Sequence, residues 1–592
     1  KLFRSLLLAA AILVYGVIVL GGIVRSTDSG GACRDWPTCR GSWMPPLQMD
    51  AWIDYVHRLA TLPVFITLLI VTVLAWRYFR NQSRASLPVF GAMGLAVFQG
   101  ILGGAMAFLD ERTDLTAIHL GLSLLILGLV LFPLVSIFMQ ERSHQVDGKR
   151  LSYRTPFARL SLVTLAAVFL LLVSGAVVSA TGTGEACPAW PLCGQGVLPS
   201  ESSGWIAMAH RLIVAAVGIL VAGVFYQAWR TQRSQTTILV ASTAVGVLFF
   251  AQALLGASKL AQELTALHEA TASAVWAVMI VQVAAVGLAG RTVEEEQQDL
   301  LAIANRTGLW KDLLMLTKPV VVTLLLVITF TGMVIGAKTW PSWNLIFWTL
   351  LGGALAAGGS GAINQYIDRF DDTRMQRTER RPIPAGRLSP GEGLAFGVAL
   401  CLVSFYLVVA LINMLAALLV LAGIIYYVLI YSIFLKKTTV QNIVIGGGAG
   451  AIPPLVGWAA ATGKLDIPAL FLFALVFLWT PPHFWALALV RRNDYARAGV
   501  PMLPVVRGEQ ETRWQILVYT IELVALTLIL PLFGLGRGFY LVSAAALGGW
   551  LLLSAWKVWR KGGNKTAWTM YRSSSMYLAF IFFALMVDRL IF

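Results

Sequence analysis

Residues 6–24 read LLLAAAILVYGVIVLGGIV, an unbroken apolar run long enough to cross the hydrocarbon core of a bilayer as one helix. Similar runs recur along the chain, eight before residue 291 and nine after residue 315, about 17 in total. Hydrophobic residues make up 58% of the chain and charged residues 12%, whereas soluble domains carry about 25% charged residues. The sequence therefore predicts an all-α integral membrane protein with about 17 transmembrane helices.

The basic side chains determine the predicted orientation. The net charge is +16, and Lys and Arg gather in alternate loops such as 76–80, 141–154 and 369–387. Loops rich in Lys and Arg face the cytoplasm, which predicts a multi-pass protein of a bacterial or archaeal plasma membrane with a cytoplasmic N-terminus. Membrane lipids surround such a protein, and the sequence has no aromatic-basic module that would bind nucleic acid.

The most polar stretch divides the chain. Residues 291–311 contain Glu294-Glu-Glu-Gln-Gln-Asp299 and predict a cytoplasmic linker with a surface helix. We expect two tandem four-helix bundles before this linker and a nine-helix bundle after it. The expected domains are 1–290, with repeats at about 1–142 and 155–290, and 312–592.

The first domain contains an internal repeat. Four ordered features recur after 149 to 154 residues, and so constant an offset predicts two tandem units that cross the membrane in the same direction. The matched features are Cys33-Arg-Asp-Trp-Pro-Thr-Cys39 with Cys187-Pro-Ala-Trp-Pro-Leu-Cys193, His57-Arg58 with His210-Arg211, Gln99 with Gln252, and His119 with His268.

The four repeated histidines are candidate haem ligands. His57 and His119 lie at the same depth in the first unit, as do His210 and His268 in the second. Each pair can face across a four-helix bundle, an arrangement that suits haem iron. Zinc is disfavoured because each pair lacks a third and fourth ligand. The alternative is that all four are histidines that only pack inside the bundle.

The cysteine pairs fall in loops on the outer side. Cys33 with Cys39 and Cys187 with Cys193 can each close a small disulfide loop in an oxidising compartment. A redox-active pair beside the haem sites is the alternative.

One carboxylate distinguishes the two units. Asp54 lies three residues before His57 and shares its helix face, whereas Ala207 occupies that place in the second unit. Intramembrane carboxylates are costly and usually functional. The alternative is that Asp54 stabilises the N-terminus of its helix.

These features resemble those of haem A synthases over residues 5–290. The resemblance rests on the two Cys-x5-Cys loops, the two His-Arg dipeptides and the two later histidines. Haem A synthases oxidise the C8 methyl group of haem O to formyl, giving haem A. The resemblance implies that His210 and His268 hold a haem b cofactor and that His57 and His119 hold the substrate haem. It also implies a catalytic role for Asp54, where the family usually has Glu.

A carboxylate motif characterises the second domain. Asn364, Asp368 and Asp372 are spaced i, i+4, i+8 and line one helix face near the cytoplasm. Such oxygen ligands suit magnesium, which bridges to substrate phosphates. The alternative is an acidic helix end followed by ordinary positive loop residues. Further candidates are the diphosphate-binding residues Arg377, Arg380, Arg381, Lys436 and Lys437, and the metal ligand Asp494 in the polar loop 491–508.

This domain resembles intramembrane prenyltransferases, and specifically the protohaem IX farnesyltransferase (haem O synthase) family, over about residues 312–592. The family joins farnesyl diphosphate to haem B and so makes haem O. The resemblance leaves His483 as a porphyrin contact or as a packing residue. The matching motifs include Leu316-Thr-Lys-Pro319, Asn364-x3-Asp-x3-Asp372, Arg381-Pro-Ile-Pro-Ala-Gly386, Pro482-His-Phe-Trp-Ala-Leu487 and Asp494-Tyr-x3-Gly499-Val-Pro-Met-Leu-Pro504.

The two resemblances together imply a bifunctional enzyme of haem A biosynthesis with haem b and magnesium as cofactors. The alternative is a bis-haem membrane electron carrier fused to a quinone-type prenyltransferase. A transporter is disfavoured because it has no use for the metal and diphosphate motif. Terminal oxidase assembly factors are candidate partners. The electron partner of the oxidation and the oligomeric state stay open.

Overall fold

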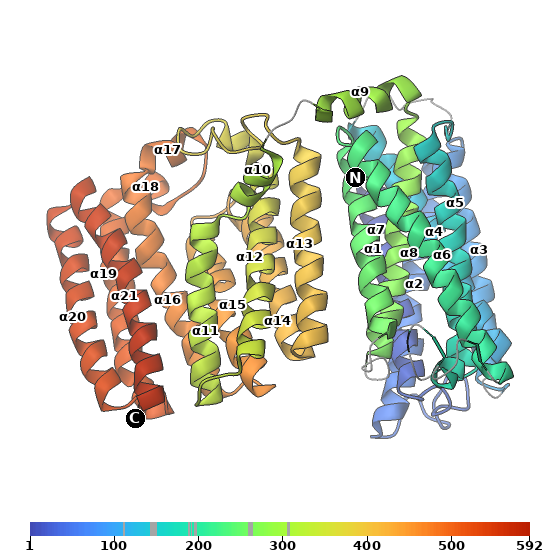
Figure 1. Ribbon diagram of the computed structural model, residues 1–592, viewed down its shortest axis with the longest axis horizontal. Coiled ribbons are helices and arrows are strands. Elements are labelled where there is room, and N and C mark those ends of the chain that lie inside the picture. The colour runs from blue at the N-terminus through green and yellow to red at the C-terminus, as the bar shows by residue number, and fades with distance from the viewer. Residues whose placement is uncertain are drawn as a thin grey trace. The chain divides into compact units, whose positions relative to one another are not determined.

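The computed structural model confirms the all-α membrane fold. It describes residues 1–109, 113–142, 151–187, 190, 192–193, 198–199, 201–257, 264–304 and 308–591. These residues contain 17 helices long and apolar enough to span a membrane, as predicted, and no β-strand. The chain forms two compact units, Lys1–Asn305 and Arg306–Phe592, whose helices are shown in Figure 1.

The first unit consists of two four-helix bundles. In the first bundle α1 packs against α2 and α4, and α3 closes the ring; α5–α8 repeat this arrangement. The helices are α1 Leu2–Ser26, α2 Met49–Tyr78, α3 Ser83–Met106, α4 Thr113–Arg142, α5 Pro156–Ala180, the 3-10 helix η1 Thr183–Ala186, α6 Ser202–Thr231, α7 Thr236–Ala257, α8 Thr265–Ala289 and α9 Val293–Ala304.

The two bundles join along α1, α4, α5 and α8. Arg25 on α1 forms an ion pair with Glu269 on α8, and Gly22 leaves room for the Glu269 side chain. Deeper in the interface the Trp276 indole donates a hydrogen bond of 2.7 Å to the Leu124 carbonyl. An unpaired charge inside the membrane is energetically costly. Separation of the two bundles would leave both side chains unpaired, so the ion pair stabilises the interface.

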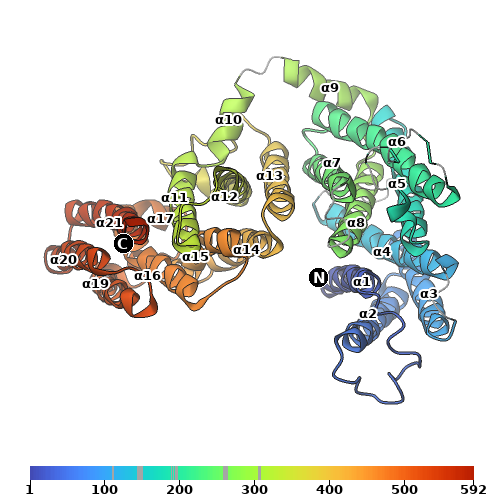
Figure 2. The same ribbon diagram turned by 60° about the horizontal axis from the view of Figure 1, so that its bottom comes forward.

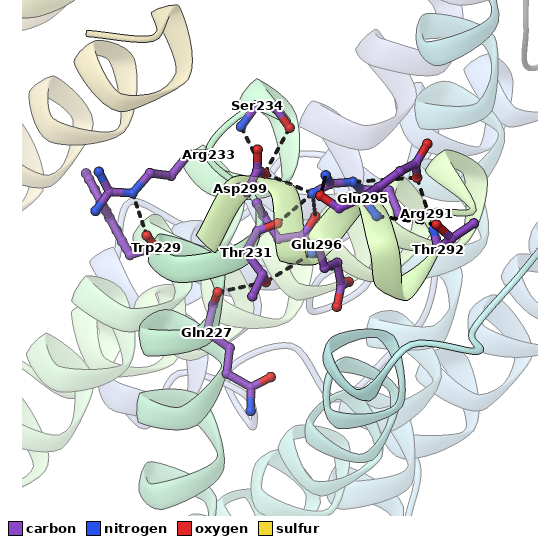
Figure 3. Close-up of polar contacts among 11 residues, drawn as sticks. Gln227, Trp229, Thr231, Arg233, Ser234, Arg291, Thr292, Glu295, Glu296 and Asp299 are labelled. Carbon is purple, nitrogen blue, oxygen red and sulfur yellow. Dashed lines mark hydrogen bonds and ion pairs between the residues drawn. The ribbon is translucent and has the colours of Figure 1, made fainter. Parts of the chain in front are cut away.

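Helix α9 belongs to the first unit and packs against α6. Arg291 donates hydrogen bonds to the Thr231 carbonyl and to Asp299, and Asp299 also accepts from the Ser234 hydroxyl at 3.0 Å (Figure 3). Glu296 is buried and accepts a hydrogen bond of 2.8 Å from Gln232. Part of the stretch that the sequence marks as a linker is therefore a docked helix.

The described part of the second unit holds nine helices long and apolar enough to span a membrane. Figure 2 shows α12 end-on between α11 and α13. The helices are α10 Leu309–Leu316, α11 Pro319–Ala337, α12 Trp343–Asp372, α13 Pro390–Leu411, α14 Met414–Ile425, the π-helix η2 Tyr426–Leu435, α15 Asn442–Thr462, α16 Ile467–Val490, α17 Arg492–Arg497, α18 Leu503–Val506, α19 Gly508–Ile529, the 3-10 helix η3 Leu530–Phe533, α20 Gly538–Lys561 and α21 Asn564–Ile591.

Small residues let the helices of the second unit approach closely. A Cβ added at Gly359 on α12 would lie 2.8 Å from the Gly397 carbonyl oxygen of α13. A larger residue at Gly359 would therefore force the two helices apart. The loop between these helices ends at a capping box, in which Ser389 and Glu392 satisfy the first backbone amides of α13. The basic loop after α12 is thus held at both ends.

Candidate functional site

Each of the four repeated histidines packs against a glycine on a neighbouring helix. A Cβ added at Gly21 on α1 would lie 3.2 Å from Cε1 of His57 on α2. A Cβ added at Gly103 on α3 would lie at the same distance from Cε1 of His119 on α4. Glycine therefore allows each imidazole to lie against helix backbone.

The second repeat reproduces these contacts. A Cβ at Gly175 on α5 would lie 3.2 Å from Cε1 of His210, and a Cβ at Gly256 on α7 would lie 2.9 Å from Cε1 of His268. Gly103 and Gly256 each end a Gln-x-x-Leu-Gly motif that begins at a repeated glutamine. This shared motif could have identified both glycines from the sequence.

The two histidines of each repeat are close enough to interact electrostatically, His57 with His119 and His210 with His268. All four side chains are half-buried. The Nδ1 atoms of His57, His119 and His268 are buried and make no hydrogen bond of normal length with the described residues. The structure thus brings together the histidine pairs that the repeat predicts.

The arginine that follows His57 or His210 forms a hydrogen bond with the disulfide loop of its repeat. Arg58 donates a hydrogen bond of 2.5 Å to the Cys33 carbonyl, and Arg211 donates one of 2.7 Å to the Cys187 carbonyl. The sequence showed both arginines as repeat matches but gave them no role. The cysteines are joined in the structure as Cys33–Cys39 and Cys187–Cys193.

Asp54 is buried and bound on both oxygens. It forms a two-pronged ion pair with Arg58, at 2.8 and 3.0 Å, and accepts a hydrogen bond of 3.3 Å from the Cys33 amide. These contacts give Asp54 an anchoring role at the first disulfide loop in addition to any role toward a substrate. The second repeat has Ala207 at the position of Asp54.

The carboxylate motif lies buried at the C-terminal end of α12. Asn364, Asp368 and Asp372 are 3%, 2% and 4% exposed. The Asn364 amide donates a hydrogen bond of 2.9 Å to Asp368 Oδ2, as the i, i+4 spacing predicts. Buried carboxylates require charged or hydrogen-bonding partners.

Three basic side chains surround this face. Lys436 forms an ion pair with Asp368, and Arg381 forms one of 2.7 Å with Asp372. Lys318 donates a hydrogen bond of 2.8 Å to Asn364 Oδ1. Removal from water, together with the nearby Arg381 and Lys436, lowers the pKa of Lys318 to about 7. Asp368 Oδ1 is buried without a hydrogen-bond partner among the described residues.

The site also depends on a π-helix. Residues 426–435 adopt this wide helix, a form that occurs frequently at functional sites. The Ser432 hydroxyl accepts a hydrogen bond of 3.1 Å from Asn364, and Lys436 follows directly after the π-helix. The sequence motif Leu316-Thr-Lys-Pro319 contains Lys318, but neither Lys318 nor Ser432 was assigned to the site.

The remaining predicted residues have other ion-pair partners or are exposed. Asp494 on α17 forms an ion pair with Arg497, and Lys437 forms one with Asp371. Arg377 and Arg380 are exposed in the loop after α12. Within the described ranges, no three His, Cys, Asp or Glu side chains form a group that could hold a metal ion, so Asp494 is not gathered with Asp368 and Asp372.

His483 occupies a packed position in α16. Its ring lies between those of Trp479 and Tyr571, with ring centroids 4.3 and 4.5 Å away, and Nδ1 hydrogen-bonds to Ser574 Oγ at 2.9 Å. With both ring faces covered, this geometry favours packing over contact with a porphyrin.

Two known families match separate parts of the chain. The UbiA prenyltransferase family matches residues 325–583, and the family described as cytochrome oxidase assembly protein, COX15-CtaA, matches residues 4–204. The second match includes the first repeat and ends at the start of α6.

Relatives named protoheme IX farnesyltransferase match most or all of the chain. The Chloroflexus aurantiacus protein is 36% identical over 100% of this chain and 99% of its own length. The Roseiflexus castenholzii protein is 38% identical, with 90% and 99% covered, and the Roseiflexus sp. protein is 40% identical, with 80% and 91% covered. A solved structure described as digeranylgeranylglyceryl phosphate synthase is 16% identical, with a TM-score of 0.42 over 47% of this chain and 98% of that one.

Proposed function

We propose, because the chain belongs to the protohaem IX farnesyltransferase family, that it converts haem B to haem O and haem O to haem A. It is a prenyltransferase joined to an oxidoreductase of the COX15-CtaA family. One observation carries the proposal: Asn364, Asp368 and Asp372 are buried among three cations at one end of α12.

The α12 face has side chains that would hold a magnesium ion beside a diphosphate. Asp368 has a buried oxygen without a partner, and magnesium usually takes one or two protein carboxylates and completes its shell with water and phosphate. Asn364, Asp368 and Asp372 would hold the ion, which when bound supplies charge that stabilises a departing diphosphate. Asp494 on α17 is a further candidate ligand for the ion.

The basic residues would stabilise the leaving group of the first reaction. Lys318, Lys436 and Arg381 would bind the diphosphate of farnesyl diphosphate, which leaves with the electron pair of the C1–O bond. The terminal carbon of the haem B vinyl group then bonds to farnesyl C1. Water adds to the resulting cation and loses a proton, which leaves a hydroxyethylfarnesyl group. The exposed Arg377, Arg380 and Lys437 would receive the substrate and release the product.

The histidine pairs fit two haems. Each repeat has two half-buried imidazoles that approach one another across a four-helix bundle. We infer that His210 and His268 hold haem b, which when bound supplies one-electron redox chemistry, and that His57 and His119 hold haem O. Conversion of the C8 methyl to formyl removes four electrons and four protons and adds one water oxygen, so an electron acceptor must take up the four electrons.

Asp54 would act at the substrate haem. It lies on the same helix as His57, and its counterpart in the cofactor unit is an alanine. A carboxylate close to the C8 methyl could accept protons released in the oxidation. The ion pair with Arg58 would then have to loosen during turnover.

We also propose that the N-terminus and the α12 site face the cytoplasm of a bacterial cell. The basic loops support this orientation. The haem sites would then lie toward the outer side, where the cysteine pairs can be oxidised.

One experiment tests the whole proposal. The chain is expressed in cells that lack haem O and haem A, and the extracted haems are measured by mass spectrometry. We expect haem A from the wild type, haem B alone from Asp372→Ala, and accumulated haem O from His119→Ala. Asp466→Ala, which removes a carboxylate at the start of α16, is the matched control and should behave as wild type.

Two results would overturn the proposal. Haem B alone from the wild type would exclude both reactions. Two tightly bound haems without any C8 oxidation would instead support a bis-haem electron carrier.

A further inference from the structure

The two repeats differ at the residue that precedes the glycine in contact with His57 or His210. Gly21 and Gly175 are equivalent, since each contacts the early histidine of its repeat and each lies 12 residues before the first cysteine (21 to 33 and 175 to 187). The residue before Gly175 is Ser174, and the residue before Gly21 is Leu20.

Ser174 reaches the imidazole of His210. Its hydroxyl oxygen lies 2.8 Å from His210 Nδ1, and the hydroxyl donates a hydrogen bond of 2.8 Å to the Leu171 carbonyl. We infer that the hydroxyl proton goes to the Leu171 carbonyl, so that the Ser174 oxygen accepts the proton of Nδ1. Nε2 of His210 then carries a free lone pair, as an iron ligand requires.

The equivalent contact is missing in the first repeat. Leu20 has no polar side-chain atom to offer His57. The His57 ring lies near the backbone of Val17, but its buried Nδ1 makes no hydrogen bond of normal length with the described residues. The first repeat therefore offers His57 a weak backbone contact with Val17 in place of a side-chain hydroxyl.

We propose that Ser174 is a positioning residue that makes the second repeat retain its haem, whereas Leu20 lets the first repeat exchange its haem. The proposal rests on the proposed function, in which His210 and His57 are iron ligands. A hydrogen bond to the second ring nitrogen fixes a ligand histidine and raises its basicity, and its loss typically costs 10- to 100-fold in affinity. A resident cofactor needs slow dissociation, and a substrate that must leave as product needs fast dissociation.

Serine at this position is not explained by the needs of its own helix. The hydroxyl is already satisfied by the Leu171 carbonyl, which serines in transmembrane helices commonly use. The acceptor role toward His210 is an additional contact, made possible because Gly175 lets the ring approach.

The test measures haem release from the purified full-length protein. Haem is loaded, and its transfer to excess apomyoglobin is followed by absorbance. The wild type should release haem in a fast and a slow phase, and His57→Ala and His210→Ala should assign the phases by removing one each. Ser174→Ala should speed the slow phase about 10-fold or more, and Ser174→Thr, which keeps the hydroxyl, should restore it.

Two further variants sharpen the test. Ser161→Ala removes a hydroxyl from the same helix that contacts Gln282 and no histidine, so it should leave both phases unchanged. Leu20→Ser should slow the fast phase by supplying the missing acceptor. The low-spin electron paramagnetic resonance signal should shift in Ser174→Ala and not in Ser161→Ala.

The outcomes separate the inference from the function beneath it. If His210→Ala removes the slow phase but Ser174→Ala and Leu20→Ser match Ser161→Ala, the inference is wrong and haem ligation stands. If His210→Ala and His57→Ala both leave the release unchanged, haem ligation itself is wrong and the inference falls with it. Leu20→Ser adds a hydroxyl to the first repeat and does not depend on Ser174. The proposal can therefore still be tested if Ser174→Ala folds poorly.

Discussion

The Nζ atom of Lys318 donates a hydrogen bond of 2.8 Å to Oδ1 of Asn364, which joins the start of α11 to the carboxylate face of α12. Lys318 has a φ of +53°, a conformation that residues other than glycine seldom adopt. Strained backbone of this kind persists where surrounding contacts enforce it, and it clusters at functional sites. The side chain is thereby aimed at the face where we propose the diphosphate binds.

Lys318→Met should weaken the binding of farnesyl diphosphate. A hydrogen bond to a charged group contributes about 1.5–3 kcal/mol, so we expect KM for farnesyl diphosphate to rise roughly 10- to 100-fold. Lys338→Met is the matched control, because Lys338 ends the same helix with a φ of +59° and lies at the opposite terminus. An unchanged KM in Lys318→Met would remove this lysine from the diphosphate site.

Gly103→Ala should displace the imidazole of His119. The added Cβ would lie 3.2 Å from Cε1 of His119, closer than about nine in ten Cβ contacts, so the ring must shift by a few tenths of an ångström. We expect reduced low-spin haem absorbance and accumulation of haem O. Gly100→Ala on the same helix meets nothing within 4 Å and should behave as wild type. Equal haem spectra for the two variants would show that the close contact does not position His119.

Asp54→Ala should loosen the first disulfide loop selectively. The change removes the carboxylate that binds Arg58 and the Cys33 amide, so Cys33–Cys39 should be reduced several-fold faster than in the wild type. Trapping of free thiols under graded reductant, followed by mass spectrometry, measures this rate. Asp50→Ala in the first turn of the same helix is the control. Reduction at the wild-type rate would limit Asp54 to a role other than anchoring.

Arg291→Gln should release α9 from the first unit. The variant loses the hydrogen bond to Thr231 and the ion pair of 3.0 Å with Asp299. Loss of about 1.5–3 kcal/mol should raise local opening roughly 10- to 100-fold. Limited proteolysis within 293–304 and amide hydrogen exchange measure the opening. Arg230→Gln, which alters a nearby arginine that contacts Tyr226, is the control, and equal protection in both variants would contradict the docking role.

The number of spanning helices could be predicted from hydropathy for two reasons. Each helix satisfies its own backbone hydrogen bonds, and each needs its own apolar run long enough to cross the membrane. The α12 face could be predicted for a similar reason, since Asn364, Asp368 and Asp372 are neighbours along a single helix. The histidine pairs were visible because the repeat places each one twice.

The partners of these residues could not be predicted from local sequence. Lys318 and Asn364 are 46 residues apart, and Asn364 and Ser432 are 68 apart, so their contacts depend on how three helices pack. The π-helix that places Ser432 changes the side-chain period, which an analysis based on the α-helical period does not detect. Ser174 could have been found by comparing the repeats position by position, as a polar residue where the other copy has leucine.

The ion pair between Arg25 and Glu269 makes the two copies of the repeat non-interchangeable. The counterpart of Arg25 is Ser179 (25 to 179), which also hydrogen-bonds to Glu269, and the counterpart of Glu269 is Leu120 (269 to 120). At these equivalent positions of the described chain, one junction carries a charged pair and the other has Ser179 and Leu120. A chain assembled from two identical first copies would lack the acid, and one from two second copies would lack the arginine. Each copy therefore supplies one half of this ion pair, and neither copy could replace the other at this interface.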